Sequence, residues 1–261
     1  NYKKDWLNPV EDGHFGFSDK LKKQLDNIKK LINTKDRDFV LIADGAEGSG
    51  KSTLVSQVCK IIDPSFNQKR MCLRPDEFVE KVTKAKKGQA VVFDEAYTGL
   101  ASRSSFSDVN KLLVEMMMEM RKKNLFIVLC IPSVFYLEKY VALHRARGLM
   151  HCYFRKSARG RFLLYNDKKL KQLYIYGKKN MTYSVPKVNF KSKFVSTAPI
   201  DWESYEKRKI EALHFKKRGS LTQKQMDQRD VVISILLKHP KLNMSGRNLS
   251  ENLTLLGVPI G

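Results

Sequence analysis

Residues 39–53 read FVLIADGAEGSGKST, and this stretch decides the fold. Its first five residues are apolar and include β-branched side chains, which predicts a short buried strand. Glycines follow at once, and the apolar periodicity of residues 53–62 then predicts a helix. A strand, a glycine-rich turn and a helix in this order predict a loop whose backbone amides face an anion at the helix N-terminus.

The turn matches the phosphate-binding pattern G-x-x-x-x-G-K-[ST], known as Walker A, at every fixed position. We expect Lys51 to reach the β- and γ-phosphates of ATP and the Ser52 hydroxyl to bind Mg²⁺. A chance glycine- and serine-rich turn is the alternative, and the strand and helix around it argue against that. The residues expected to hold the nucleotide are Gly45, Ala46, Glu47, Gly48, Ser49, Gly50, Lys51, Ser52 and Thr53.

A second motif, AVVFDE, occupies residues 90–95. Its four apolar residues predict a strand that ends in the acidic pair Asp94 and Glu95, as in a Walker B segment. We expect Asp94 to hold Mg²⁺ through water and Glu95 to polarise the water that attacks the γ-phosphate. A strand ending in a solvated acidic turn is the alternative, and it is improbable at this distance after a Walker A loop. Together the two motifs predict an ATPase rather than a protein that only binds ATP.

This pair of motifs resembles the additional-strand, catalytic-glutamate division of P-loop NTPases, which includes AAA+, RecA-like, FtsK/HerA-like and terminase ATPases. It does not resemble the nucleotide kinases, which lack the general-base glutamate, or the GTPases, whose Asn/Thr-Lys-x-Asp signature is missing from the sequence. The resemblance covers residues 38–155 and implies a RecA-like P-loop NTPase core.

Apolar strands alternate with helical segments along this core, which predicts an α/β fold with a parallel sheet between helices. An irregular arm and a helix from residue 18, together residues 1–37, precede the core. The expected strands are residues 39–43, 70–73, 90–93, 125–131 and 149–154. The expected helices within the core are residues 53–62, 75–86, 108–123 and 134–143.

Ser133 follows the strand at residues 125–131, where the resemblance places a polar sensor of the γ-phosphate. An N-cap for the next helix is the alternative role. Arginine often neutralises the transition state of such enzymes, sometimes from a neighbouring subunit. Arg103, Arg145 and Arg147 are the candidates, and a surface or DNA-facing role is the alternative for each.

A basic turn at residues 120–125 and the helix after the sensor strand are similar to those of HerA/FtsK-type translocases and phage morphogenesis ATPases. This resemblance implies a homo-oligomer, such as a ring. Ser133 departs from the Gln or Asn usual at that position, and large terminases often have Ser or Thr there, so a terminase-like ATPase stays open.

The formal net charge of +22 predicts a polyanionic partner, and we favour nucleic acid, DNA rather than RNA. No apolar run approaches the length of a membrane span, so we expect no membrane partner. The four scattered cysteines are expected to be small core residues in a reducing compartment, the cytoplasm, or the host cytoplasm for a viral protein. The chain begins at Asn1 and stops at Gly261 within a motif, so we expect further residues at both ends.

Residues 156–219 form a basic, tyrosine-rich extension in which strands are expected at 161–165 and 173–176, joined by a turn at 166–167, and a charged helix at 202–217. Basic residues suit phosphates and aromatic residues suit bases, so we expect DNA contact here. A small β subdomain with tyrosines in its core is the alternative. The aromatic residues are Tyr165, Tyr174, Tyr176, Tyr183 and Phe190.

Residues 220–261 are expected to form a C-terminal helical unit, either an incomplete helix-turn-helix or a helical lid. We therefore expect an ATP-driven DNA translocase or packaging-type motor of a virus or mobile element. A large-terminase-like ATPase or an AAA+ initiator or helicase is the alternative within the enzyme class. A nucleotide-switched DNA-binding adaptor or regulator is the alternative from another class.

Overall fold

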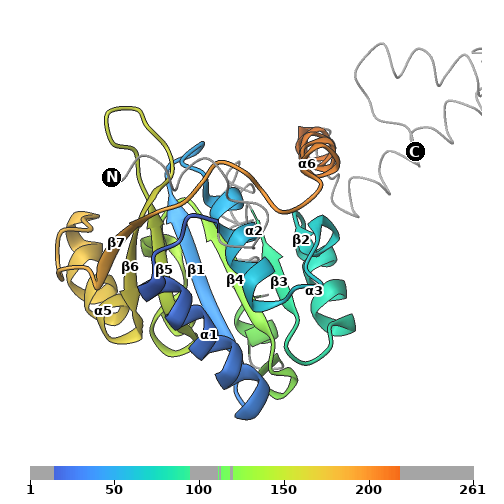
Figure 1. Ribbon diagram of the computed structural model, residues 1–261, viewed down its shortest axis with the longest axis horizontal. Coiled ribbons are helices and arrows are strands. Elements are labelled where there is room, and N and C mark those ends of the chain that lie inside the picture. Colours follow the sequence, from blue (N-terminus) through green and yellow to red (C-terminus); the bar gives the residue numbers. More distant parts are fainter. Residues whose placement is uncertain (1–14, 95–110, 112, 118–119, 218–261) are drawn as a thin grey trace, which may run out of the picture. The chain divides into compact units, whose positions relative to one another are not determined.

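The computed structural model describes residues 15–94, 111, 113–117 and 120–217 (Figure 1). Residues 1–206 and 207–261 form two compact units, and the first contains the sheet. The expected unit at residues 220–261 lies outside the described residues. Among the helices that are described, none has both the length and the apolar character needed to cross a bilayer.

The centre of the first unit is a seven-stranded sheet with the order β2-β3-β4-β1-β5-β6-β7. The first five strands run parallel, and β6 and β7 continue the same sheet in antiparallel pairing. The expected α/β fold with a mostly parallel sheet is therefore confirmed. The strands are β1 (Phe39–Gly45), β2 (Met71–Cys72), β3 (Ala90–Phe93), β4 (Phe126–Ile131), β5 (Ala146–Cys152), β6 (Arg161–Asn166) and β7 (Phe190–Lys193).

Strand β4 lies between β1 and β3, and Ile127 is paired with Val40 on one side and Val91 on the other. All residues of β3 and β4 are buried, as expected for continuous apolar strands covered on both faces. Because parallel strands end at one edge, the segments after β1, β3 and β4 meet there. This edge contains the glycine-rich loop, Asp94 and Ser133.

Four helices occur where the sequence predicts them, within a few residues at each end: α1 (Asp19–Thr34), α2 (Lys51–Ile62), α3 (Pro75–Lys84) and α6 (Trp202–Lys217). In Figure 1, α1 and α2 lie over the same face of the sheet. Helix α1 buries Leu21, Leu25 and Ile32, spaced as one helical face. Helix α1 also contacts α2, the helix that follows the glycine-rich loop.

Two expected elements are wrong. The predicted strand at residues 173–176 is a π-helical turn, Leu173–Gly177, that continues α5 (Asp167–Gln172). The Asn166 side chain accepts a hydrogen bond from the Lys169 amide at 3.0 Å, so a capped helix begins where a turn was expected. Strand β7 pairs with β6 instead.

The predicted helix at residues 134–143 is also interrupted. It consists of a 3₁₀ turn, Val134–Tyr136, and a π-helical turn, Val141–Arg145. Between them, the Leu137 carbonyl accepts a hydrogen bond from the Tyr174 hydroxyl at 2.7 Å. A distant side chain therefore satisfies a backbone group that a continuous helix would have bonded internally.

Candidate functional site

The loop after β1 has a shape that its glycines permit. Gly45 has φ +136°, and a Cβ atom there would lie 2.1 Å from the Cys152 carbonyl oxygen. Gly50 has φ +95°, and a Cβ there would lie 2.9 Å from the Phe194 ring. Side chains at these two positions would therefore force the loop away from β5 and from the segment after β7.

Lys51 is the first residue of α2 and folds back over this loop. Its ammonium group donates to the carbonyl oxygens of Gly45 at 2.7 Å and Ala46 at 2.9 Å. The Ser49 hydroxyl is buried within the loop and has no hydrogen-bond partner among the described residues. The loop thus combines a positive charge, an enclosed hydroxyl and the N-terminus of a 12-residue helix, three features that favour an anion.

Asp94 lies directly after β3 and is 1% exposed. Its backbone N–H donates to the Cys72 carbonyl at 2.8 Å, which fixes the end of the strand. The hydroxyl of Tyr205, from α6, donates to its carboxylate. Burial, followed by the charge of Asp94, raises the pKa of Tyr205 well above its usual value, so this hydroxyl remains a neutral donor.

The Ser52 side chain also acts on the Tyr205 hydroxyl and lowers its pKa, an effect smaller than those of burial and of Asp94. Ser52 and Asp94, the two residues expected to hold Mg²⁺, therefore both act on the same hydroxyl. A hydroxyl and a carboxylate are hard oxygen ligands, and Mg²⁺ usually takes one or two protein oxygens together with waters and substrate phosphates. The two residues fit that ion. Sequence reasoning missed Tyr205, because nothing local to residue 205 indicates a partner 111 positions away.

Ser133 occupies the same edge of the sheet, next to a buried polar network. Its hydroxyl lies 2.9 Å from the Tyr183 hydroxyl, which donates to Asp44. It also accepts a hydrogen bond from the Phe135 amide at 3.4 Å, the capping contact named as its alternative role. The side chain therefore caps the 3₁₀ turn and joins the network.

Asp44, the last residue before the loop, is the centre of that network and is fully buried. It accepts hydrogen bonds from the Val134 amide at 2.8 Å and from Tyr183, and its carboxylate lies 2.8 Å from Nδ1 of His151. The His151 and Tyr183 rings stack with their centroids 3.7 Å apart. Burial, followed by the charge of Asp44, raises the pKa of Tyr183 well above its usual value. The network ties β1, β4 and β5 together beneath the loop.

Neither the family models nor the curated proteins compared with this chain match it. The roles proposed for individual residues are therefore inferred from their chemistry and their positions in the structure.

The candidate arginines are placed differently from one another. Arg145 lies just before β5, at the edge opposite the loop, where it is 8% exposed and ion-paired with Asp38. Arg147 is exposed, at the register shift between β1 and β5. Arg103 and the proposed general base Glu95 lie outside the described residues. Among the described candidates, only Arg147 presents its side chain to solvent.

Most of the aromatic residues of the basic extension belong to the core. Tyr165 and Tyr174 are buried in the main hydrophobic cluster, and Tyr183 is partly buried against it. Their hydroxyls are also bonded internally, Tyr165 to the Tyr183 carbonyl at 2.8 Å. Of the five aromatic residues, only Tyr176 is largely exposed, whereas Phe190 lies under the Lys20 ammonium. Stacking on bases through this set would therefore be limited to Tyr176.

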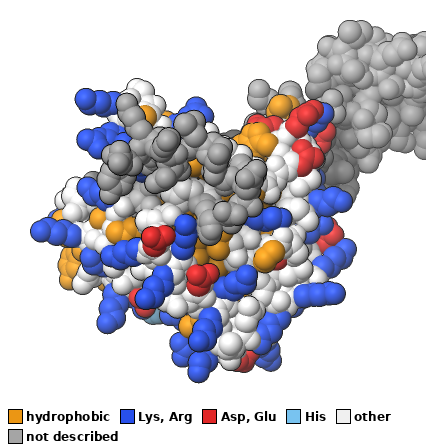
Figure 2. All heavy atoms as spheres, viewed as in Figure 1, with side chains coloured by type: hydrophobic (Ala, Val, Ile, Leu, Met, Phe, Trp, Pro, Cys, Tyr) orange, Lys and Arg blue, Asp and Glu red, His pale blue; other side chains and the backbone are white. Residues whose placement is uncertain are grey.

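The basic residues of the extension remain at the surface. Arg155, Lys156 and Arg159 are exposed on the turn before β6, and Lys191 and Lys193 are exposed on β7. Figure 2 shows Lys and Arg side chains spread over the viewed face, with Asp and Glu side chains in fewer places between them. This arrangement suits contact with backbone phosphates more than recognition of bases.

Proposed function

We propose that the chain binds ATP and Mg²⁺ at residues 45–53 and hydrolyses the γ-phosphate bond, with DNA as the polymer on which it acts. The observation that supports this most is that Ser52 and Asp94 both act on the Tyr205 hydroxyl, beside the loop that Lys51 covers. Two hard oxygens and an ammonium group at a helix N-terminus are what a metal–triphosphate complex requires.

Each residue has a defined part in this proposal. The amides of the loop and Lys51 hold the triphosphate and stabilise negative charge on it, and Ser52 and Asp94 hold Mg²⁺, which supplies further positive charge at the phosphates. Glu95, next to Asp94 in the sequence, accepts the proton of the attacking water. Ser133 lies at the same edge and contacts the triphosphate through its hydroxyl.

The DNA part of the proposal depends on charge. The chain has an excess of 22 positive charges, and the basic side chains of the extension are exposed. Such a surface binds nucleic acid through phosphates, with affinity that falls steeply as salt rises. We propose a homo-oligomeric motor of the translocase or packaging type, in which Arg103 or Arg147 serves a neighbouring subunit's site.

One observation favours a second candidate, a nucleotide-switched DNA-binding regulator. Tyr205 is fully buried and its hydroxyl occupies the Asp94 carboxylate proposed for Mg²⁺, so metal binding requires Tyr205 to leave it. A site that must change conformation before Mg²⁺ can bind is compatible with a slow regulatory switch as well as with a motor.

Steady-state ATPase assays with and without DNA test the proposal, using Lys51→Ala and Glu95→Gln. We expect DNA to stimulate turnover, Lys51→Ala to abolish ATP binding, and Glu95→Gln to bind ATP without turning it over. Lys60→Ala, on the same helix, is the matched control and should retain activity. Turnover that ignores DNA, combined with DNA binding that follows the nucleotide state, would favour the regulator.

The mass of the Glu95→Gln variant in solution with ATP and DNA tests the oligomer. We expect a multiple of the 30.2 kDa chain that forms only when both ligands are present. A monomer under these conditions would contradict the ring.

A further inference from the structure

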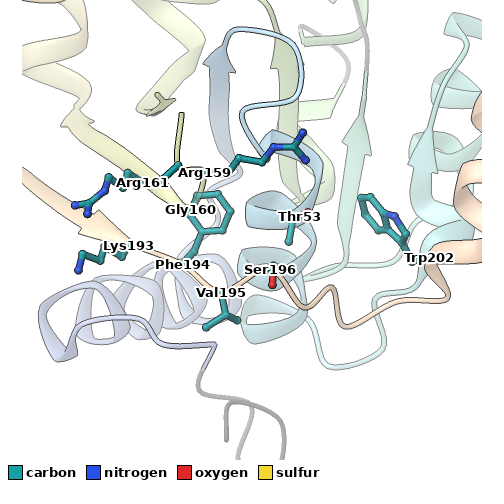
Figure 3. Close-up of a pocket in the computed structure, with 11 residues that line it drawn as sticks. Thr53, Arg159, Gly160, Arg161, Lys193, Phe194, Val195, Ser196 and Trp202 are labelled. Carbon is teal, nitrogen blue, oxygen red and sulfur yellow. The ribbon is translucent and has the colours of Figure 1, made fainter. Parts of the chain in front are cut away.

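A pocket of about 570 Å³ opens beside the glycine-rich loop, at the N-terminal end of α2 (Figure 3). Its size falls within the ~300–1,000 Å³ typical of small-molecule sites. Gly50 and Thr53 form its floor. The residues around them come from three segments: residues 158–161 before and within β6, residues 193–196 at the end of β7 and after it, and Trp202 at the start of α6.

The walls of this pocket are held in place by internal contacts. The buried side chain of Gln57, one turn further along α2, donates to the Val195 carbonyl at 2.8 Å and the Thr197 carbonyl at 2.7 Å. The Phe194 amide donates to the Gly160 carbonyl at 3.0 Å, which joins the other two segments. The pocket is therefore preformed, and binding there would need little ordering of the chain.

The lining has a definite chemical character. It contains three cationic side chains, Arg159, Arg161 and Lys193, and no carboxylate among the described residues that line it. Arg161 and Lys193 are paired across β6 and β7, where like charges repel unless an anion is near. Aromatic surface comes from Phe194 and the half-buried Trp202. Cations together with aromatic rings suit a ligand that has both phosphate and a flat ring.

The positions of these groups relative to the glycine-rich loop indicate how a bound ligand would be oriented. Figure 3 shows Phe194 and Trp202 on either side of Thr53, and Arg159 extending toward the turn that precedes α2. A Cβ at Gly48 would lie 3.6 Å from the Arg159 guanidinium, so this cation borders the loop itself. A triphosphate in the loop would thus have Arg159 beside it, and the rest of the nucleotide would leave the loop past Thr53 into the pocket.

We propose that this pocket binds the nucleoside half of ATP, with the base against the indole of Trp202 and the phosphates next to Arg159. The inference rests on the proposed function, because the loop has to hold the triphosphate. Stacking on Trp202 gives affinity for a flat base, whichever edge groups that base has. Phe194 shapes the pocket near Gly50 and, being 5% exposed, serves as its wall.

Intrinsic fluorescence tests this, because the chain has two tryptophans, Trp6 and Trp202. In a Trp6→Phe background, we expect ATP to change the emission of Trp202, and inorganic tripolyphosphate to bind without that change. ATP should bind about tenfold more tightly than tripolyphosphate, at the lower end of what base–aromatic stacking contributes. Trp202→Ala should remove this advantage and Trp202→Phe should keep most of it. Tyr176→Ala, at an exposed aromatic residue outside the pocket, is the control.

The outcomes separate the two proposals. If ATP binding depends on Lys51 but equals that of tripolyphosphate and ignores Trp202→Ala, the pocket assignment fails and the ATP site stands. If neither ATP nor tripolyphosphate binds, the proposed function fails and this inference fails with it. Photolabelling of the unmodified chain by 8-azido-ATP needs no variant: label on residues 158–161 or 193–202 supports the pocket, and label confined to other segments overturns it.

Discussion

The Tyr205 hydroxyl donates a hydrogen bond to the carboxylate of Asp94, which lies 111 positions earlier in the chain. Ser52 acts on the same hydroxyl and lowers its pKa, less strongly than burial and Asp94 raise it. A neutral side chain thus satisfies the carboxylate that we propose for Mg²⁺, and the hydroxyl and the metal compete for that carboxylate.

This competition predicts that Tyr205→Phe binds Mg²⁺–ATP about tenfold more tightly than the unmodified chain. A hydrogen bond to a charged group contributes ~1.5–3 kcal/mol, and ~1.4 kcal/mol corresponds to a factor of ten. The nucleotide-free variant should lose about 1–3 kcal/mol of unfolding free energy, because Asp94 stays buried without its donor. Calorimetric titration with Mg²⁺ and with EDTA measures the first effect, and Tyr176→Phe is the exposed control. Weaker Mg²⁺–ATP binding by the variant would show that Tyr205 helps the site rather than closing it.

The loop should not tolerate a side chain at Gly45. We expect Gly45→Ala to lower the free energy of unfolding by about 3 kcal/mol and to abolish ATP binding, because its Cβ meets the Cys152 carbonyl and its backbone is strained. Gly148→Ala is the matched control: its nearest contacts, at 3.4 Å, are ordinary, and we expect a loss below about 1 kcal/mol. Urea unfolding monitored by circular dichroism compares them. Equal losses would mean that the loop relaxes around the added atom.

The lowered pKa of Asp63 leads us to expect that the stability of the chain depends on pH. Burial raises the pKa of this carboxyl. Hydrogen bonds from Ser65, the Ala90 amide and Arg70 lower the pKa by more than burial raises it, so the pKa in the folded chain is below its usual value. The stabilisation is therefore present above the unfolded pKa of about 3.9 and is lost as pH falls through the folded pKa.

We expect Asp63→Asn to cost about 3 kcal/mol at pH 7, because Arg70 would lose its partner at a buried site. That cost should shrink below about pH 4, where the unmodified chain also takes up the proton. Unfolding free energies from pH 3 to 7 test this, with the exposed Asp19→Asn as control. A difference that is constant with pH would exclude the ionised carboxylate as its source.

We expect substitution of Arg145 to affect stability and substitution of Arg147 to affect catalysis. Arg145→Ala leaves Asp38 buried without its cation, and we expect a loss of about 3 kcal/mol in unfolding free energy. Arg147→Ala should change stability by less than about 0.5 kcal/mol, because its side chain is exposed. If Arg147 serves a neighbouring site, ATP turnover should fall by at least ~10³-fold at unchanged ATP affinity. Normal turnover would leave Arg103 as the remaining candidate.

The four thiols should be inert in the folded chain. All four cysteines are buried, and burial, followed by the charge of Asp44, raises the pKa of Cys152 to about 12. Burial also raises the pKa of Cys59 and of Cys130. We expect no rapid reaction with Ellman's reagent at pH 8 and four equivalents of thiol in denaturant. A fast-reacting thiol in the native chain would contradict the burial of that residue.

Local pattern predicts the centre of the fold well. The strands at residues 90–93 and 126–131 are continuous apolar runs. Strands that are buried on both faces need apolar side chains at every position, so this pattern identifies them. The glycine-rich loop at residues 45–50 is predictable from the sequence, because its backbone conformation at Gly45 and Gly50 leaves no room for a side chain.

Sequence reasoning fails where a distant partner decides the structure. Residues 173–176 alternate in composition like a strand, yet Leu173 and Tyr174 are both buried while Ile175 and Tyr176 are both exposed, a helical arrangement. Asn166 starts that helix and the core completes it, so tertiary packing overrides local β-propensity. The partners of the Asp44 carboxylate and the Tyr205 partner of Asp94 are similarly remote, at 90 to 139 positions.

The two outer strands of the sheet limit how copies of this chain could join. Strand β2 has two residues, and β7 presents Lys191 and Lys193 to solvent along its length. Short or lysine-bearing borders resist backbone pairing with a neighbour. Subunits of the proposed ring would therefore have to meet through side chains on loops and helices, and a continuous intermolecular β-structure would not form.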